Sequence, residues 1–246
     1  GRRTTTSPTI EMSIIGSLLG DPEVRQALTR SIIAALATAL IAAPLGVLAA
    51  MKRNGTYKPT STVAQLWGGP TDANAFWFKS GNDDILNPLF RTKKIKKGPA
   101  KFVPLWDAAK AQTIFEQMLV QTSNNILGAV AANDGIAGAV VATLKAKGLK
   151  PIPLSGQDAT VQGVQNIISG WQTNTVYKYY PDEANAAAAA AIALYRGKKP
   201  PSNGTRPNGK KKQLAYVIPV TAITKANYRL LFRDGTTLLF ALMLAV

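Results

Sequence analysis

Three polar clusters follow short apolar runs of the sequence and carry the side chains best suited to chemistry. Asn133 comes after residues 126–131, Asp158 comes after residues 152–154, and Lys178 ends residues 173–178. Each run is typical of a parallel strand, so these side chains should emerge along one edge of one sheet. Asn133 can donate and accept hydrogen bonds, whereas Asp158 only accepts and Lys178 only donates. Open α/β sheets bind ligands at such an edge, so the sequence predicts a polar ligand site there.

The elements that must position these residues alternate between strand and helix. Repeated units of this length predict an α/β fold, a parallel sheet flanked by helices with right-handed crossovers. Strands are expected over 61–66, 101–104, 126–131, 152–154 and 173–178, and helices over 72–87, 108–122, 135–147 and 161–169. Beyond them we expect a helix over 182–194, a strand over 214–220 and a short helix over 225–232.

Composition narrows the class of protein and of chemistry. The 246 residues are 46% hydrophobic and 17% charged, which favours a packed fold over disorder. Cysteine and histidine are absent, so disulfides, triad-type catalysis and zinc sites are not expected. The adjacent acids Asp83–Asp84 and Asp182–Glu183 lie beside turn or helix-start signals rather than as an acid and base pair. We therefore expect that this protein is not an enzyme and that it binds neither a metal ion nor a cofactor.

A strong positive charge is concentrated in two stretches of the chain. The formal charge is +16, from 29 Lys and Arg against 13 Asp and Glu, and much of it lies in residues 91–97 and 198–212. Both stretches are interrupted by Pro, Gly or Asn, which is typical of loops. Solvated surface turns are the favoured interpretation, and binding to anionic polymers is the alternative. Neither interleaved aromatics nor a helix-turn-helix pattern is present, so no nucleic acid partner is expected.

The N-terminal segment contains a long uncharged stretch. Residues 31–51 carry no charge and are followed by Lys52 and Arg53. That length is enough to span a bilayer, but Ala, Thr, Pro and Gly make it only weakly hydrophobic, and a buried core helix remains an equal alternative. We divide the chain into an atypical segment over 1–59, a main lobe over 60–180, and a crossover helix, final strand and apolar tail over 181–246. The apolar tail over 236–246 is expected to pack against another part of the protein.

Four motifs occur in a characteristic order: Trp67–Asp72 (WGGPTD), Ala131–Gly135 (AANDG), Ser155–Asp158 (SGQD) and Thr175–Lys178 (TVYK). Through them the chain resembles the periplasmic sugar-binding proteins of ABC importers, and most closely their xylose-binding branch. The resemblance implies a lobe of the type I periplasmic-binding fold and non-catalytic capture of a monosaccharide, a pentose such as xylose. It also implies an ABC permease as partner and a periplasmic or extracytoplasmic location. Residues 31–51 separately resemble a spanning helix of an ABC permease, which allows membrane anchorage.

The resemblance assigns six ligand residues by position. Sugars present hydroxyls that donate and accept, together with an apolar ring face, so amides, charges and an aromatic plate suit them. Trp106 would be the plate, with Phe102 as the alternative, although Trp106 can equally be a core residue or pack onto the next helix. Helix capping is the alternative for Asn133 and for Asp158, and solvent exposure is the alternative for Lys178. The assigned residues are Asp72, Asn74, Trp106, Asn133, Asp158 and Lys178.

The chain departs from this family at its N-terminal side. About 60 residues precede the WGGPTD loop, and none reproduces the ligand motifs of the family's first lobe. We therefore expect an incomplete or atypical first lobe, and weak or no sugar binding by this chain alone. Two other functions stay open: a membrane-anchored component of the same transporter, and a basic protein that binds anionic polymers and retains a vestigial sugar site.

Overall fold

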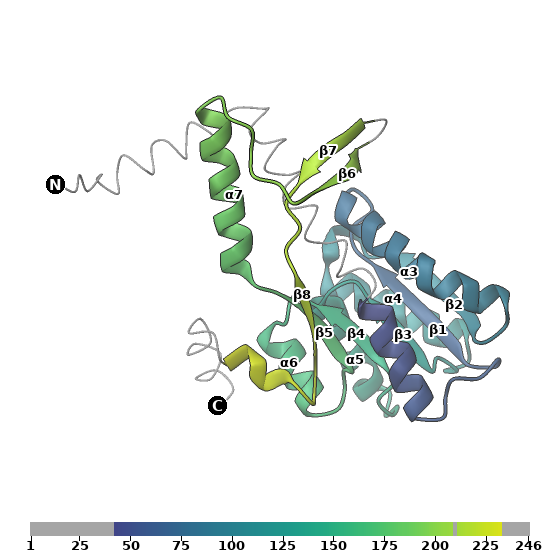
Figure 1. Cartoon of the computed structure of the whole chain (residues 1–246). Helices are drawn as coiled ribbons and strands as arrows, with labels where there is room; N and C mark the ends of the chain where they lie inside the picture. Colours follow the sequence, from purple (N-terminus) through teal and green to yellow (C-terminus); the bar gives the residue numbers. More distant parts are fainter. Residues whose placement is uncertain (1–41, 209–210, 233–246) are drawn as a thin grey trace. The chain divides into compact units, whose positions relative to one another are not determined.

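The computed structural model describes residues 42–208 and 211–232, which divide between two compact units (Figure 1). Residues 42–178 and 220–232 belong to the first, which we call the sheet unit. Residues 179–219 belong to the second, which we call the hairpin unit. Residues 1–41 of the atypical N-terminal segment and the apolar tail over 236–246 lie outside the described residues.

A six-stranded sheet forms the centre of the sheet unit, with the strand order β2-β1-β3-β4-β5-β8. Its first five strands are parallel, as the sequence predicts. The sixth strand is antiparallel to β5, and Lys178 pairs with Val220 where the chain leaves the unit and returns to it. The strands are β1 (Thr62–Trp67), β2 (Lys96–Phe102), β3 (Gly128–Ala131), β4 (Leu154–Gln157), β5 (Asn174–Lys178) and β8 (Val220–Thr224).

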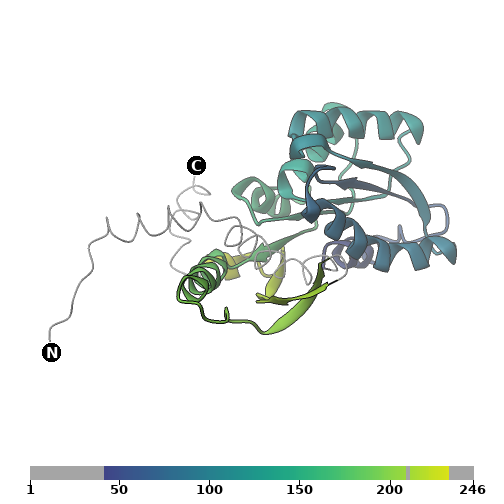
Figure 2. The ribbon, with the colours of Figure 1, turned by 90° about the horizontal axis from the view of Figure 1, so that it is seen from above.

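Helices cover both faces of this sheet (Figure 2). On one face lie α3 (Ala73–Arg91) and the helix over 42–53, whose apolar side chains share a core with Val63 of β1 and Val130 of β3. On the other face lie α4 (Ala108–Gln121), α5 (Asp134–Ala146) and α6 (Val161–Ile168), which pack side by side in that order. The four numbered helices begin with the capping side chains Asp72, Asp107, Asn133 and Thr160, each accepting a backbone N–H of the first turn.

The uncharged N-terminal stretch is described from residue 42 onward, and this part lies against the sheet. Val47 and Met51 are fully buried, and Met51 packs so closely on Gly128 that a Cβ there would come within 2.9 Å of its sulfur. Burial in the core, one of the two alternatives for residues 31–51, is therefore observed for the described part. Across residues 42–208 and 211–232, no helix is long and apolar enough to cross a membrane.

The hairpin unit consists of a helix and a two-stranded antiparallel sheet. Its elements are α7 (Tyr180–Tyr195), β6 (Gly204–Asn208) and β7 (Lys211–Ala215). The basic stretch over 198–212 was expected to be a loop, but most of β6 and β7 lies within or directly after it. The predicted strand over 214–220 is also wrong, because β7 ends at Ala215 and β8 begins at Val220. The sequence pattern over 214–220 predicts one strand, but the chain there leaves β7 and, after Pro219, enters β8.

Other boundaries also differ from the sequence prediction, among them that of the strand expected over 152–154, which is β4 (Leu154–Gln157). The strand expected over 101–104 is β2, which begins at Lys96 and therefore includes the end of the basic stretch over 91–97. Ile95, only 1% exposed, anchors that stretch in the core beside two exposed lysines. The helix expected over 225–232 is a short 3-10 helix, η2 (Tyr228–Phe232), and a second one, η1 (Pro104–Trp106), follows β2.

Candidate functional site

All six predicted ligand residues lie at the carboxyl edge of the parallel sheet. Each of the five parallel strands contributes at its end, so the topology alone brings the residues to one side of the sheet. Contacts connect four of them into two pairs, Asp158 with Lys178 and Asp72 with Trp106. Asn133 lies between the pairs, and Asn74 bonds to Asp72 through its backbone N–H. In the order of the strands across the sheet, the residues are Trp106 after β2, Asp72 and Asn74 after β1, Asn133 after β3, Asp158 after β4, and Lys178 at the end of β5.

An ion pair between Asp158 and Lys178 forms what we call the charged corner. Lys178 Nζ lies 2.9 Å from Asp158 Oδ1, and the two side chains are 12% and 29% exposed. Partial burial strengthens such a charge-assisted contact and still leaves it accessible to a ligand. Asp158 is not the cap of α6, because Thr160 has that role. The corner therefore presents a carboxylate and an ammonium group side by side.

The loop that carries Asp158 has an unusual backbone. Asp158 and the next residue, Ala159, have φ angles of 92° and 48°, in the left-handed region that favours glycine. Three consecutive backbone N–H groups hold it: Asp158 N donates to Val176 O at 2.9 Å, Ala159 N to Thr175 Oγ1 at 3.1 Å, and Thr160 N to Asp134 Oδ2 at 2.9 Å. The position of the Asp158 carboxylate thus depends on contacts from β5 and from Asp134.

Asn133 lies between the two pairs and caps α5. Its Oδ1 accepts the N–H of Ile136 at 2.9 Å, and the residue is half-buried. The cap uses the amide oxygen, so the amide nitrogen is the group that Asn133 can offer to a ligand. Capping and ligand binding, which the sequence left as alternatives, are compatible in this geometry.

A second pair, Asp72 and Trp106, forms what we call the aromatic corner. Trp106 Nε1 donates to Asp72 Oδ2 at 3.1 Å, while Asp72 Oδ1 accepts the N–H of Asn74 at 2.9 Å. The indole lies against the backbone of Gly68, where a Cβ would overlap the ring, and its plane meets the ring of Phe78 edge-on at 6.2 Å. Packing and a hydrogen bond therefore hold Trp106 against the loop after β1, and its side chain is half-buried at the sheet edge.

Phe102, the alternative plate, belongs to a separate aromatic cluster. Its ring centroid lies 5.0 Å from those of both Trp67 and Phe76. Phe76 is 48% exposed, and sequence reasoning did not single it out. An exposed aromatic near the end of β2 is a further ring that a sugar face could contact.

Sequence reasoning also missed Asp134, the first residue of α5. Its side chain is 1% exposed and accepts hydrogen bonds from Thr160 N at 2.9 Å and from Gln172 Nε2 at 2.8 Å. Burial raises the pKa of this carboxyl to about 6, while hydrogen bonds from Gln172, Thr160 and Thr175 act in the opposite direction. The AANDG motif contained this residue, but its partners lie 26 and 38 positions away, so no local signal indicated its role.

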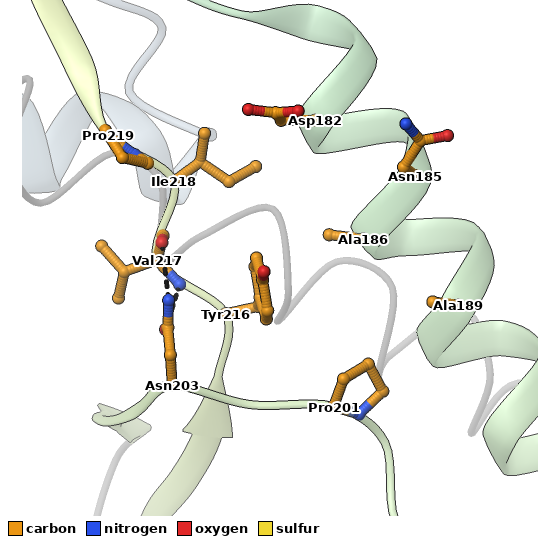
Figure 3. A pocket seen from close by; sticks show the side chains of 10 residues that line it. All are labelled: Asp182, Asn185, Ala186, Ala189, Pro201, Asn203, Tyr216, Val217, Ile218 and Pro219. Carbon is orange, nitrogen blue, oxygen red and sulfur yellow. Dashed lines mark hydrogen bonds between the residues drawn. The ribbon is translucent and has the colours of Figure 1, made fainter.

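The hairpin unit has a hollow of its own, of about 530 Å³, between α7 and the stretch over 201–219 (Figure 3). Asp182 and Asn185 of α7 border it, together with small alanine side chains. Across from the helix, Asn203 holds Val217 by two hydrogen bonds, of 2.9 Å from its Nδ2 and 2.6 Å to its Oδ1. No residue predicted to bind ligand lies here. In the part of the chain that the structure describes, no group of three acidic residues is arranged to hold a metal ion.

A parallel sheet with polar and aromatic side chains along its carboxyl edge is typical of ligand-binding lobes of the α/β class. Comparison with known families is more specific: the model described as periplasmic binding protein domain matches residues 24–199. The chain belongs to this family. The resemblance inferred from the four motifs is confirmed, and the fold is of the type I periplasmic-binding kind.

Individual relatives agree with this assignment. The chain is 36% identical over 180 residues to the D-xylose-binding periplasmic protein of Haemophilus influenzae, and 34% identical over 179 residues to that of Escherichia coli K12. Each alignment covers 72% of this chain and 54% of the relative, so the chain spans about half the length of these curated relatives.

Among solved structures, one similar protein is an ABC transporter solute-binding protein of Clostridium phytofermentans with bound β-D-glucose. It has a TM-score of 0.72 and 20% identity, and the match covers 81% of this chain and 65% of that one. Another is a carbohydrate transporter solute-binding protein of Chloroflexus aurantiacus in complex with D-glucose, with a TM-score of 0.67, 26% identity and coverage of 79% and 65%.

Proposed function

We propose that the sheet unit is a sugar-binding lobe of the substrate-binding component of an ABC importer. Its role is non-catalytic capture of a monosaccharide, a pentose such as D-xylose, in the periplasm or another extracytoplasmic space, for delivery to an ABC permease. The relatives named above support the class of ligand. The observation that carries the proposal is the placement of the six residues on one sheet edge, with Asp158 and Lys178 paired at 2.9 Å.

The chemistry of this edge suits a sugar. The carboxylate of Asp158 accepts, the ammonium of Lys178 donates, and the amide of Asn133 can donate as well, so neighbouring hydroxyls are distinguished by their order. Trp106 supplies an apolar surface for the ring face. A two-lobed receptor gains affinity by enclosing its ligand, so one edge alone should bind weakly, with a dissociation constant roughly in the millimolar range (about −4 kcal/mol).

Calorimetry and thermal shift of the full chain against D-xylose, D-ribose, D-glucose and D-galactose test this proposal. A ligand that binds only the folded state raises its melting temperature, so we expect D-xylose at high concentration to do so. Asp158→Asn should abolish the shift. The matched control is Asp84→Asn, the same change of charge on an exposed residue of α3, which should leave it intact. A chain whose melting temperature responds to none of these sugars would contradict the proposal, and micromolar binding of D-xylose would show that this chain needs no further lobe.

A second candidate function rests on the basic stretch around β2. Residues 85–106 contain six Lys and Arg and no acidic residue. Lys96 and Lys97 line a hollow of about 390 Å³ near the start of β1 and the end of α4, at the edge opposite the six ligand residues. Because Ile95 is buried, the backbone of this stretch is held in place. Binding of an anionic polymer here would weaken steeply with salt, and heparin binding by Lys96→Gln/Lys97→Gln, compared with Lys198→Gln/Lys199→Gln, would locate it.

A further inference from the structure

The buried carboxylate of Asp134 connects three separate segments at the sheet edge. Its Oδ2 accepts the N–H of Thr160 at 2.9 Å and lies 3.3 Å from the Thr160 hydroxyl, while its Oδ1 accepts Gln172 Nε2 at 2.8 Å. Thr160 belongs to the loop after β4, and Gln172 precedes β5. Asp134 itself follows Asn133 at the end of β3. One side chain therefore joins the chain segments that carry Asn133, Asp158 and Lys178.

Two glycines provide the space for this carboxylate. A Cβ on Gly156 of β4 would overlap Asp134 Oδ1, and a Cβ on Gly163 of α6 would overlap Oδ2. Neither glycine has a positive φ, so neither is needed for its backbone conformation. The close approach of a carboxylate is the physical reason that only glycine fits at these two positions.

The loop held by Asp134 is the strained one that presents Asp158. A left-handed conformation at two consecutive non-glycine residues is costly and persists only where surrounding contacts impose it. We propose that Asp134 is a positioning residue for the ligand site: its carboxylate holds the loop over 157–160 so that Asp158 meets Lys178, and protonation of the carboxyl loosens that hold. As far as it concerns ligand affinity, this inference rests on the proposed sugar-binding function.

A carboxylate is required here because its neighbours donate. The N–H of Thr160 can only donate, and the amide nitrogen of Gln172 also donates to the carbonyl oxygen of Asn174 at 3.2 Å. That second bond fixes the orientation of the Gln172 amide, since rotating it would set its oxygen against another oxygen. An asparagine at position 134 would therefore place an N–H group against one of these two donors. The isosteric variant Asp134→Asn tests the acceptor without changing the shape of the side chain.

Acidity should act on the same contact. Burial raises the pKa of Asp134 to about 6, so a proton binds in the mildly acidic range and removes one acceptor. The hydrogen bonds from Gln172 and Thr160 lower this pKa, so protonation favours a local state in which Asp134 stays buried but the loop has lost its bond to the carboxylate, even though burial itself favours the protonated carboxyl over the unfolded state. Asp158, on the loop after β4, is the charged group that raises this pKa by repulsion, and Lys178 of β5 is paired with it. The side chains of Gln172 and Thr175, which also hydrogen-bond to Asp134, are neutral. Affinity for sugar in the wild-type chain should accordingly fall as the pH falls through about 6.

The first measurement is amide hydrogen exchange of the full chain, expressed as protection factors. We expect Asp134→Asn to lower the protection of residues 158–160 by at least about tenfold, and Asp84→Asn to leave it unchanged. Gly163→Ala, which displaces the carboxylate without altering any charge, should have the same effect as Asp134→Asn and serves if the latter does not fold. Wild-type protection should fall with acidity, whereas that of Asp134→Asn should not. Unchanged protection in both loop variants would overturn the inference, whether or not the chain binds sugar.

The second measurement is D-xylose affinity from about pH 5 to 8, above and below the pKa of about 6. In the wild type it should weaken on acidification, and in Asp134→Asn it should be at least about tenfold weaker at neutral pH and nearly independent of pH. Wild-type affinity that is equally strong throughout, or a variant that binds as the wild type does, would overturn the positioning role. A wild type that binds no sugar at all would instead contradict the proposed function, and the exchange data alone would then decide the role of Asp134.

Discussion

The charged corner and the aromatic corner lie at opposite ends of the same sheet edge and are built in different ways. Left-handed φ angles at two consecutive non-glycine residues occur in both, at Asp158 and Ala159 in one and at Leu105 and Trp106 in the other. In the charged corner, Asp158 depends on a buried carboxylate and on contacts from β5. In the aromatic corner, Trp106 packs on a glycine and makes one hydrogen bond to Asp72. The first arrangement depends on charge and hydrogen-bond direction, whereas the second depends mainly on shape. We infer that the charged corner is the more sensitive to pH and to single substitutions.

The pH dependence of stability tests the buried support of the charged corner and has the largest expected effect. The pKa of Asp134 is raised from 3.8 to about 6 by burial, so the folded state holds the proton more tightly than the unfolded state does. Its contribution to stability is complete below about pH 4 and is lost as the pH rises through about 6, by up to about 3 kcal/mol.

Urea unfolding of the wild type and of Asp134→Asn, at several pH values between about 4 and 7, measures this contribution. The difference between the two free energies of unfolding should change with pH in this window, because only the wild type has a titrating carboxyl at position 134. The other groups titrate equally in both proteins, so their effects cancel in the difference. A difference that stays constant across the window would show that the carboxyl has an ordinary pKa and that its burial has little consequence.

Removing the cation of the charged corner should have the next largest effect. Lys178→Met removes the ammonium group that lies 2.9 Å from the partly buried carboxylate of Asp158, which we expect to lower the free energy of unfolding by roughly 1–3 kcal/mol. It should also abolish the response to D-xylose. Urea unfolding and calorimetry measure the two effects.

A double-mutant cycle with Asp158→Asn separates the ion pair from other losses. If the two residues act as a pair, the double variant should be less destabilised than the sum of the single variants. Additive effects would mean that the 2.9 Å contact contributes little to stability.

The position of the charged corner was predictable from the sequence, but its support was not. Asp158 and Lys178 each end an apolar run, and parallel strands necessarily bring their carboxyl ends together. The support comes from Asp134 through partners 26 and 38 residues away, which no local pattern encodes. Whether the Asp134 side chain contacts Thr160 and Gln172 depends on how distant segments pack in the whole fold.

Outside the charged corner, local sequence patterns predicted the helices between parallel strands but did not predict the antiparallel strands. The helices between the parallel strands were predicted closely because each begins with a capping residue and buries an apolar stripe. The hairpin of β6 and β7 was not predicted, because β6 contains glycine and proline and β7 begins with two lysines. Such residues normally indicate a loop. The antiparallel pairing of β8 with β5 was missed as well, since strand direction within a sheet depends on contacts distant in sequence.

In the aromatic corner a single substitution should have a moderate effect. Trp106→Phe keeps a flat ring but removes the Nε1–H that donates to Asp72, so we expect a loss of about 1 kcal/mol in the free energy of unfolding. D-xylose binding should weaken but persist, because the apolar plate remains. Trp171→Phe is the matched control, since that indole lies on Lys145 away from the ligand residues. Loss of binding equal to that in Lys178→Met would remove the distinction between the two corners.

The smallest effect should come from the other ion pair of the described residues, Lys79 with Asp83 on α3. It joins residues one turn apart on a helix surface. The Lys79 side chain is 33% exposed and the Asp83 side chain is 25% exposed. Pairs of this kind contribute roughly 0.3–0.5 kcal/mol and are screened by salt. Asp83→Asn should therefore change the free energy of unfolding by less than about 0.5 kcal/mol and leave D-xylose binding intact. If it cost as much as Lys178→Met, the two ion pairs would be equivalent, and the special role of the charged corner would have to be abandoned.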